Sequence, residues 1–303
     1  MPRSTLRGPG QFRAGQRNGR SFPARARDGT CEGGNSNSRR RPESGHPPRS
    51  NPVQAIASAV QDTGPAAERY SRFHSAVSRA QLLQWLDDLG TDLALVDVSG
   101  PGARAAEVAA CAGHAVLRVV QPGITVAPVG SNGIAGRLRT VAADASGLEF
   151  LPDACADGVI AEDRTLSRQL AAEALVGEIA RVLRPGGSVF ACVDSLTLGM
   201  AVLAEQHHWP HLVDLPNADV VLVPWPDGTI TRCYGAEQLR ELFTGSGLEV
   251  SWIRPRTVFS PRTVSYLLAR DPSSFGRLVS AELTARADDS VGAHLIVSAM
   301  LPR

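Results

Sequence analysis

Two glycines separated by a proline, Gly100 and Gly102, end a short apolar segment over residues 93–98. Glycine has no Cβ, so the backbone can turn sharply there and come close to a ligand. The alanine-rich segment over residues 103–112 predicts a helix that follows at once. The first turn of a helix presents unpaired N–H groups, so this arrangement indicates a site for a nucleotide-type ligand.

The same residues allow two other interpretations. The spacing Gly100-x-Gly102-x-x-Ala105 matches the fingerprint of dinucleotide-binding proteins, a weak signal when it stands alone. A tight turn between a strand and a helix, with no ligand, also explains the glycines. Residues further along the chain must decide between these interpretations.

Several side chains could exchange protons with a substrate. Glu162 and Asp163 come directly after a predicted strand, and Asp194 follows the next strand. His207 lies in a long insertion, approximately residues 195–234. Carboxylates and imidazole are the usual general acids and bases, although each of these residues could instead serve packing or solvation. The histidines near His207 lack the spacing of metal ligands, so no metal site is predicted.

The segments that would position these residues alternate between strand and helix patterns. Strands are predicted over residues 93–98, 115–120, 137–143, 157–161 and 188–193. Continuous apolar strands of this kind belong to parallel sheets that helices cover on both faces. Such sheets bind ligands at the carboxyl ends of their strands, so the glycine turn and the candidate acids and bases would share one edge.

Helices are predicted over residues 66–89, whose apolar positions share one face, and over residues 166–183. The buried stripe of the second helix would be Leu170, Leu175, Ile179 and Leu183. Later segments predict a hairpin around Asp227-Gly228, a helix over 235–246, a strand from 247, two helices within 260–289 and a last strand over 293–301.

Composition separates a tail from a domain. Residues 1–62 are rich in Gly, Pro, Ser, Asn and Arg, and predict a disordered tail. Aromatic residues are sparse there, so a nucleic-acid partner is not expected. Residues 63–303 can bury one core with a smaller lobe. Five scattered cysteines without a C-x-x-C pair, and no apolar run near the ~18 residues of a membrane span, favour a cytoplasmic protein with no membrane partner.

Residues 181–187, Arg-Val-Leu-Arg-Pro-Gly-Gly, lead into the predicted strand over 188–193. This segment resembles the RVLRPGG signature of the class I S-adenosylmethionine-dependent methyltransferases. The resemblance covers residues 66–303, and it is closest to the small-molecule methyltransferases. It implies a Rossmann-like, doubly wound α/β sheet of seven strands in the order 3-2-1-4-5-7-6, with strand 7 antiparallel and a cap insertion after strand 5.

The resemblance also implies S-adenosylmethionine as the cofactor. Ser99, Gly100 and Gly102 would lie close to its methionine part, Asp144 would bond the adenine amino group and Ala145 would lie beside it. Gln121 stands at the position of the ribose-binding residue. The predicted cofactor site is therefore Asp97, Ser99, Gly100, Gly102, Gln121, Asp144 and Ala145, and the candidate catalytic residues are Glu162, Asp163 and His207.

Two departures from the family pattern keep alternatives open. The family's turn has an acid and a first glycine where this chain has Val96 and Val98. Asp97 therefore lies one residue away from the position of the family's acid. Val120-Gln121 replaces the acid that ends the second strand.

The leading hypothesis is a methyltransferase that acts on a small molecule, such as a secondary metabolite. A catalytically degenerate binding or scaffolding protein of the same fold is the alternative, and an NAD-dependent oxidoreductase is less favoured. The sequence identifies neither the methyl acceptor nor the oligomeric state.

Overall fold

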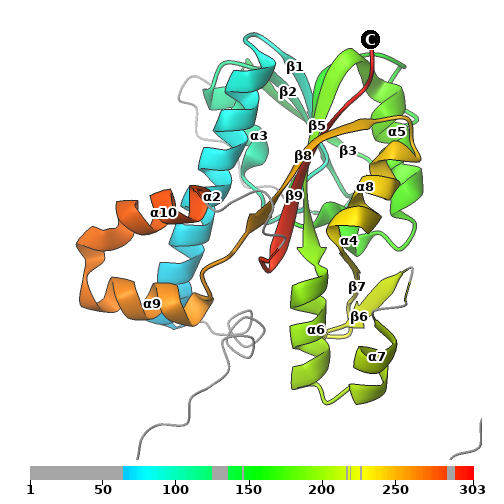
Figure 1. Cartoon of the computed structure of the whole chain (residues 1–303). Coiled ribbons are helices and arrows are strands. Elements are labelled where there is room, and N and C mark those ends of the chain that lie inside the picture. Colours follow the sequence, from blue (N-terminus) through cyan, green and yellow to red (C-terminus); the bar gives the residue numbers. More distant parts are fainter. Residues whose placement is uncertain are drawn as a thin grey trace, which may run out of the picture. The chain divides into compact units, whose positions relative to one another are not determined.

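Strands and helices alternate along the described chain and build one sheet with helices on both faces (Figure 1). The computed structural model describes residues 64–124, 136–144, 147–215, 218, 220–225, 227–284 and 291–303. These residues belong to one compact unit over residues 49–303. The predicted tail, part of the loop after residue 121 and Ala145 lie outside the described residues. None of the described helices combines the length and the hydropathy needed to cross a bilayer.

The central sheet has the predicted seven-strand order. Its strands are β1 (Ala94–Asp97), β2 (Ala115–Val120), β3 (Leu138–Ala142), β4 (Ala156–Ala161), β5 (Leu183–Ser195), β8 (Glu249–Arg256) and β9 (His294–Met300). They lie side by side in the order β3-β2-β1-β4-β5-β9-β8. Strands β1 to β5 are parallel, and β9 is antiparallel to both of its neighbours. The predicted fold class is therefore confirmed.

Successive strand residues point to opposite faces, and each face has its own helices. Leu95 and Ile160 pack against α2 (Pro65–Leu89) and α3 (Ala105–Cys111). On the other face Val96 and Val159 pack among residues of α5 (Ala172–Val182) and α8 (Ala236–Thr244). Since both faces of the central strands are covered, β1, β4 and β5 are mostly apolar, whereas the edge strand β3 carries the exposed side chains Arg139 and Thr140.

The chain after β5 forms a cap at the carboxyl edge of the sheet. It consists of α6 (Leu196–Glu205), α7 (Trp209–Asp214) and the antiparallel hairpin of β6 (Val221–Pro224) and β7 (Ile230–Tyr234). The hairpin was predicted, whereas α6 and α7 were not. Ser195 begins α6 by accepting a hydrogen bond from the amide of Leu198 (3.1 Å). The end of β7 continues the sheet beside β5.

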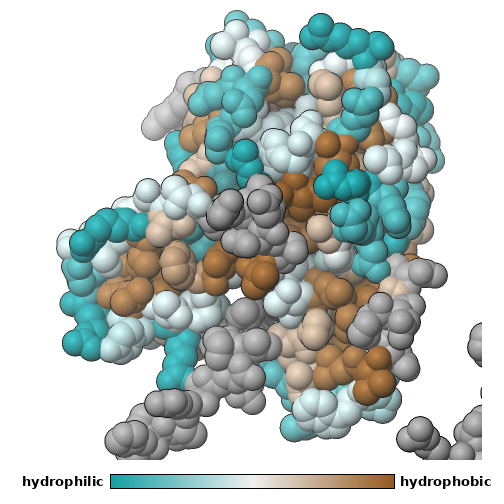
Figure 2. All heavy atoms as spheres, in the orientation of Figure 1, coloured by the Kyte–Doolittle hydropathy of each residue, from teal (hydrophilic) through white to brown (hydrophobic). Residues whose placement is uncertain are grey.

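A second lobe is attached to α2. The predicted helix pair is present as α9 (Pro261–Arg270) and α10 (Phe275–Leu283), joined by a short 3₁₀ turn, η2 (Pro272–Ser274). Its apolar side chains pack against Phe73 and Val77 of α2. Figure 2 shows apolar side chains on the surface of this lobe and of the cap.

The helix predicted over residues 166–183 is wrong as a single element. A four-residue helix, α4 (Thr165–Arg168), is followed by an extended Gln169 and then by α5. The Thr165 hydroxyl fixes α4 at the strand tips by donating to the carbonyl of Glu162 (2.8 Å), with the carbonyl of Val98 also in reach (3.2 Å). Because the chain breaks there, Leu170 is 58% exposed and does not belong to the buried stripe.

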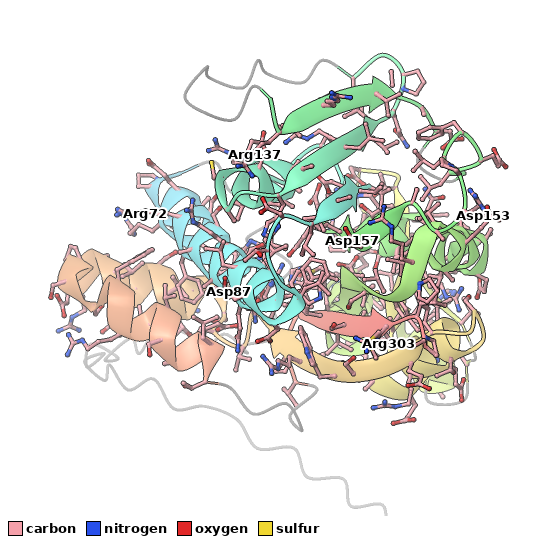
Figure 3. The ribbon with its side chains drawn as sticks, turned by 90° about the horizontal axis from the view of Figure 1, so that it is seen from above. Arg72, Asp87, Arg137, Asp153, Asp157 and Arg303 are labelled. Carbon is pink, nitrogen blue, oxygen red and sulfur yellow. The ribbon has the colours of Figure 1, made fainter. Side chains whose placement is uncertain are left out.

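The RVLRPGG segment lies at the opposite edge of the sheet, where the parallel strands begin, and it contacts the start of β4. Residues 184–187 form an irregularity in β5, with Gly186 at φ +84°. A Cβ on Gly187 would lie 2.9–3.0 Å from two backbone carbonyl oxygens, so only glycine fits. Asp157, which lies among the strands in Figure 3, accepts from the amide of Ala94 (2.8 Å) and pairs with Arg184. These residues are structural in this chain.

Candidate functional site

The glycine turn follows β1 at the carboxyl edge and is bonded to the chain that follows β4. The amide of Gly100 donates to the carbonyl of Glu162 (3.2 Å). The amide of Glu162 in turn donates to the Ser99 hydroxyl (2.9 Å). This pair of bonds holds the turn against the backbone of the segment that begins at Glu162.

Asp163 lies directly on the glycine turn. Its Oδ2 accepts from the amide of Gly102 (3.2 Å) and lies 3.5 Å from Nη1 of Arg168. A Cβ on Gly100 would collide with the same oxygen. Asp163 and Arg164 both have left-handed φ angles, +57° and +59°, which turn the chain back over the glycines. The structure thus brings Asp163 into contact with the predicted cofactor residues Gly100 and Gly102.

Asp97 lies under the turn instead of facing outward from it. The side chain is 2% exposed, accepts from the amide of Ser99 (3.0 Å) and lies 3.9 Å from Arg118. Burial raises the pKa of Asp97, although the hydrogen bonds from Ser99 and the charge of Arg118 oppose this shift. The Asp97 side chain therefore stabilises the turn by accepting a hydrogen bond from the backbone amide of Ser99.

Two polar residues end the neighbouring strands on the same edge. Gln121 directly follows β2 and Asp144 lies two residues beyond β3, and both are exposed. Strands β2 and β3 are parallel, with Val120 opposite Ala142. The glycine turn, Gln121 and Asp144 therefore follow three adjacent strands in the order β1, β2, β3.

Glu162 is bound in a buried ion pair. Both of its carboxylate oxygens accept from the guanidinium of Arg256, at 2.8 Å each, and Nε of Arg256 donates to Gln81 of α2 (2.7 Å). Burial alone would raise the pKa of Glu162, but the charge and hydrogen bonds of Arg256 outweigh it and lower the pKa. A carboxylate held in this way is a poor proton acceptor.

Further polar residues extend the site across β5, β9 and β8. Asp194, His294 and Arg256 lie opposite one another on these strands and share the face that α2 covers. Nε2 of His294 lies 3.6 Å from Asp194, and Nδ1 lies 3.1 Å from the Thr257 hydroxyl. Arg164 bridges from the segment after β4 to Asp194 (3.4 Å). The sequence indicated Asp194 alone among these residues.

His74 of α2 completes this group. Its ring lies 5.8 Å from the ring of His294. Burial, together with the positive charge of Arg256, lowers the pKa of His74 to about 4. The imidazole is therefore neutral at pH 7, and the side chain is half-buried.

The lowered pKa of His74 predicts a loss of stability in mild acid. A group whose pKa falls on folding stabilises the native state above its unfolded pKa of 6.5, and this contribution is lost as the pH falls towards 4. From pH 7 to pH 5 the wild type should lose about 1–2 kcal/mol more unfolding free energy than the variant His74→Gln. Urea unfolding at the two pH values measures this difference. Equal losses in the two proteins would contradict it.

His207 does not join the other candidate bases. It is exposed, has a φ of +59° and lies between α6 and α7, with its ring 5.9 Å from Trp209. Figure 1 shows that junction at the end of the cap away from the sheet. The three predicted catalytic residues thus have different surroundings. Glu162 is paired with Arg256, Asp163 contacts the glycine turn and His207 lies in the cap.

Comparison with known proteins shows a likeness in structure alone. No protein-family model and no curated protein matches the sequence. Among solved structures, a chain of the complex between the Haloferax volcanii Trm112 methyltransferase activator and a methyltransferase is similar with a TM-score of 0.50 at 15% identity. That likeness covers 83% of this chain and 98% of the other. The chain has the class I methyltransferase fold.

Two further solved structures are similar to this chain. The 1,6-didemethyltoxoflavin-N1-methyltransferase of Burkholderia thailandensis has 17% identity and a TM-score of 0.48, over 85% of this chain and 93% of its own. The [4+2]-cyclase SpnF has 21% identity and a TM-score of 0.49, over 74% and 80%.

Proposed function

We propose that the protein is an S-adenosylmethionine-dependent methyltransferase of the cytoplasm that acts on a small molecule. The observation that carries this proposal is the glycine turn of β1 at the carboxyl edge, with Gln121 and Asp144 exposed after the two adjacent strands. Open sheets of this topology bind their ligands at that edge.

The residues present fit the parts of this cofactor. The turn at Gly100 and Gly102 lets a ligand approach the backbone closely once the Asp163 side chain rotates away. The Gln121 amide can both donate to and accept from ribose hydroxyls. The Asp144 carboxylate can accept from the adenine amino group. The carboxylate of Asp163 suits a positively charged ligand.

The acceptor would lie beyond the carboxyl edge of the sheet, towards the α9–α10 lobe and the cap. When bound, the cofactor supplies an electrophilic methyl group on a positively charged sulfur. This chain's contribution is alignment and exclusion of water. Neutral His74 would hydrogen-bond the acceptor and position it, with His294 held beside it by Thr257 and Asp194; the lowered pKa of His74 makes it too weak a base to remove a proton at pH 7. Glu162 would serve as a positioning residue.

Transfer of a labelled methyl group tests the proposal. The full-length protein is incubated with methyl-labelled S-adenosylmethionine and a small-molecule extract of the source cells. We expect label in a small-molecule product, with S-adenosylhomocysteine formed in equal amount. Cofactor binding without any transfer would contradict the enzymatic proposal.

The second candidate is a binding protein without catalytic activity, which the position of Asp163 on the glycine turn favours. The same observation disfavours an NAD-dependent oxidoreductase, because a carboxylate beside the amide of Gly102 repels the pyrophosphate that would bind there. Binding of S-adenosylhomocysteine without turnover would support the binding protein.

A further inference from the structure

Asp163 and Arg168 form an ion pair directly over the glycine turn. Oδ2 of Asp163 and Nη1 of Arg168 are 3.5 Å apart. The position of a Cβ on Gly100 would be 3.0 Å from the same guanidinium nitrogen. Both charges of the pair therefore lie where a ligand would approach the turn.

The backbone over residues 162–168 is held in place, whereas the charged groups of Asp163 and Arg168 can exchange partners. The hydroxyl of Thr165 and the amide of Glu162 hold the segment against the turn. The side chains of Asp163 and Arg168 are 27% and 42% exposed. An ion pair as exposed as this one contributes little to stability, so a ligand can displace it at small cost.

We infer that Asp163 and Arg168 bind the amino-acid end of the cofactor, Asp163 pairing with its α-ammonium group and Arg168 with its α-carboxylate. This inference rests on the proposed function. An amino acid carries one charge of each sign on the same carbon, which matches two opposite charges held side by side. The guanidinium fork suits a carboxylate in particular. The internal ion pair keeps these charges satisfied until the ligand replaces it.

This assignment makes the two residues determinants of specificity. S-adenosylhomocysteine carries the amino-acid end, whereas 5′-methylthioadenosine has the same adenosine and thioether without it. The pair should therefore favour the first ligand and leave the second unaffected. The adenosine part would be bound in both cases by the same residues, Gln121 and Asp144.

Isothermal titration of the full-length protein with these two ligands tests the inference. We expect the wild type to bind S-adenosylhomocysteine at least 10-fold more tightly than 5′-methylthioadenosine. Asp163→Asn and Arg168→Gln should each weaken S-adenosylhomocysteine binding about 10-fold, as expected for loss of one charge-assisted hydrogen bond, and leave 5′-methylthioadenosine binding unchanged. Arg277→Gln is the matched control, because it breaks another exposed ion pair, with Asp271.

The remaining outcomes overturn the inference. Equal weakening of both ligands, no weakening, or tighter binding of S-adenosylhomocysteine by Asp163→Asn would each contradict it, the last by showing that Asp163 only blocks the turn. Failure of the wild type to bind either ligand would overturn the proposed function as well. Thermal unfolding of each variant checks that its fold is intact.

Discussion

Replacing Arg256 with methionine is expected to lower the free energy of unfolding by about 3–5 kcal/mol. The substitution leaves the carboxylate of Glu162 buried without the two 2.8 Å hydrogen bonds that now satisfy it, and it also removes the donor to Gln81. The side chains of Arg256 and Glu162 are only 1% and 6% exposed, so water cannot take the place of the guanidinium. Urea unfolding at pH 7, followed by circular dichroism, measures the loss.

Two further variants separate the ion pair from general packing. Arg254→Met is the control, because Arg254 lies on the same strand and contacts the Trp252 ring at its surface (4.4 Å), a contact worth about 0.5–1 kcal/mol. The double variant Glu162→Leu with Arg256→Met should recover at least half of the loss, since no charge is then left buried. A loss for Arg256→Met no larger than that for Arg254→Met would contradict the assigned role of the pair.

The substitution Gly100→Val should weaken S-adenosylhomocysteine binding at least about 100-fold and leave the fold intact. A valine side chain would fill the space over the turn that Asp163 now occupies and that the ligand would need. A Cβ at this position would meet only the ends of the partly exposed Asp163 and Arg168 side chains, so these can move aside and the cost falls on ligand binding rather than on folding. Isothermal titration of the full-length protein gives the affinity, and thermal unfolding checks the fold.

Gly177→Val is the matched control for this prediction. Gly177 lies in α5, and a Cβ there would meet nothing within 4 Å. Its binding of S-adenosylhomocysteine should equal that of the wild type. Binding by Gly100→Val within a factor of 3 of the control would contradict a ligand position at the turn.

The sequence predicts the elements of this fold well because their signals are local. Strands such as β2 and β4 are short, mostly apolar segments, and their order follows from the family resemblance. The break between α4 and α5 could not be predicted, because it depends on hydrogen bonds from Thr165 to the chain after β4 and β1. The apolar periodicity places Leu170 on the buried face of a helix, but only if one unbroken helix runs through residues 166–183.

The candidate site is predictable only where a single segment carries it. The glycine turn is visible in the sequence because Gly100 and Gly102 are neighbours. The partner of Glu162 is not, since Arg256 lies 94 residues away on β8. The approach of His74 to His294 depends likewise on how α2 packs against the sheet. For Asp163, which the sequence did indicate, the contact with the glycine turn was not predictable, because it depends on two left-handed residues, Asp163 and Arg164.

A crystal structure of the full-length protein grown with S-adenosylhomocysteine tests the central claim most directly. We predict the adenosyl group between Gln121 and Asp144, the sulfur over the turn at Gly100 and Gly102, and the Asp163 side chain moved off the amide of Gly102. A structure at saturating ligand that has Asp163 still bonded to that amide, and no ligand at the turn, would contradict the account.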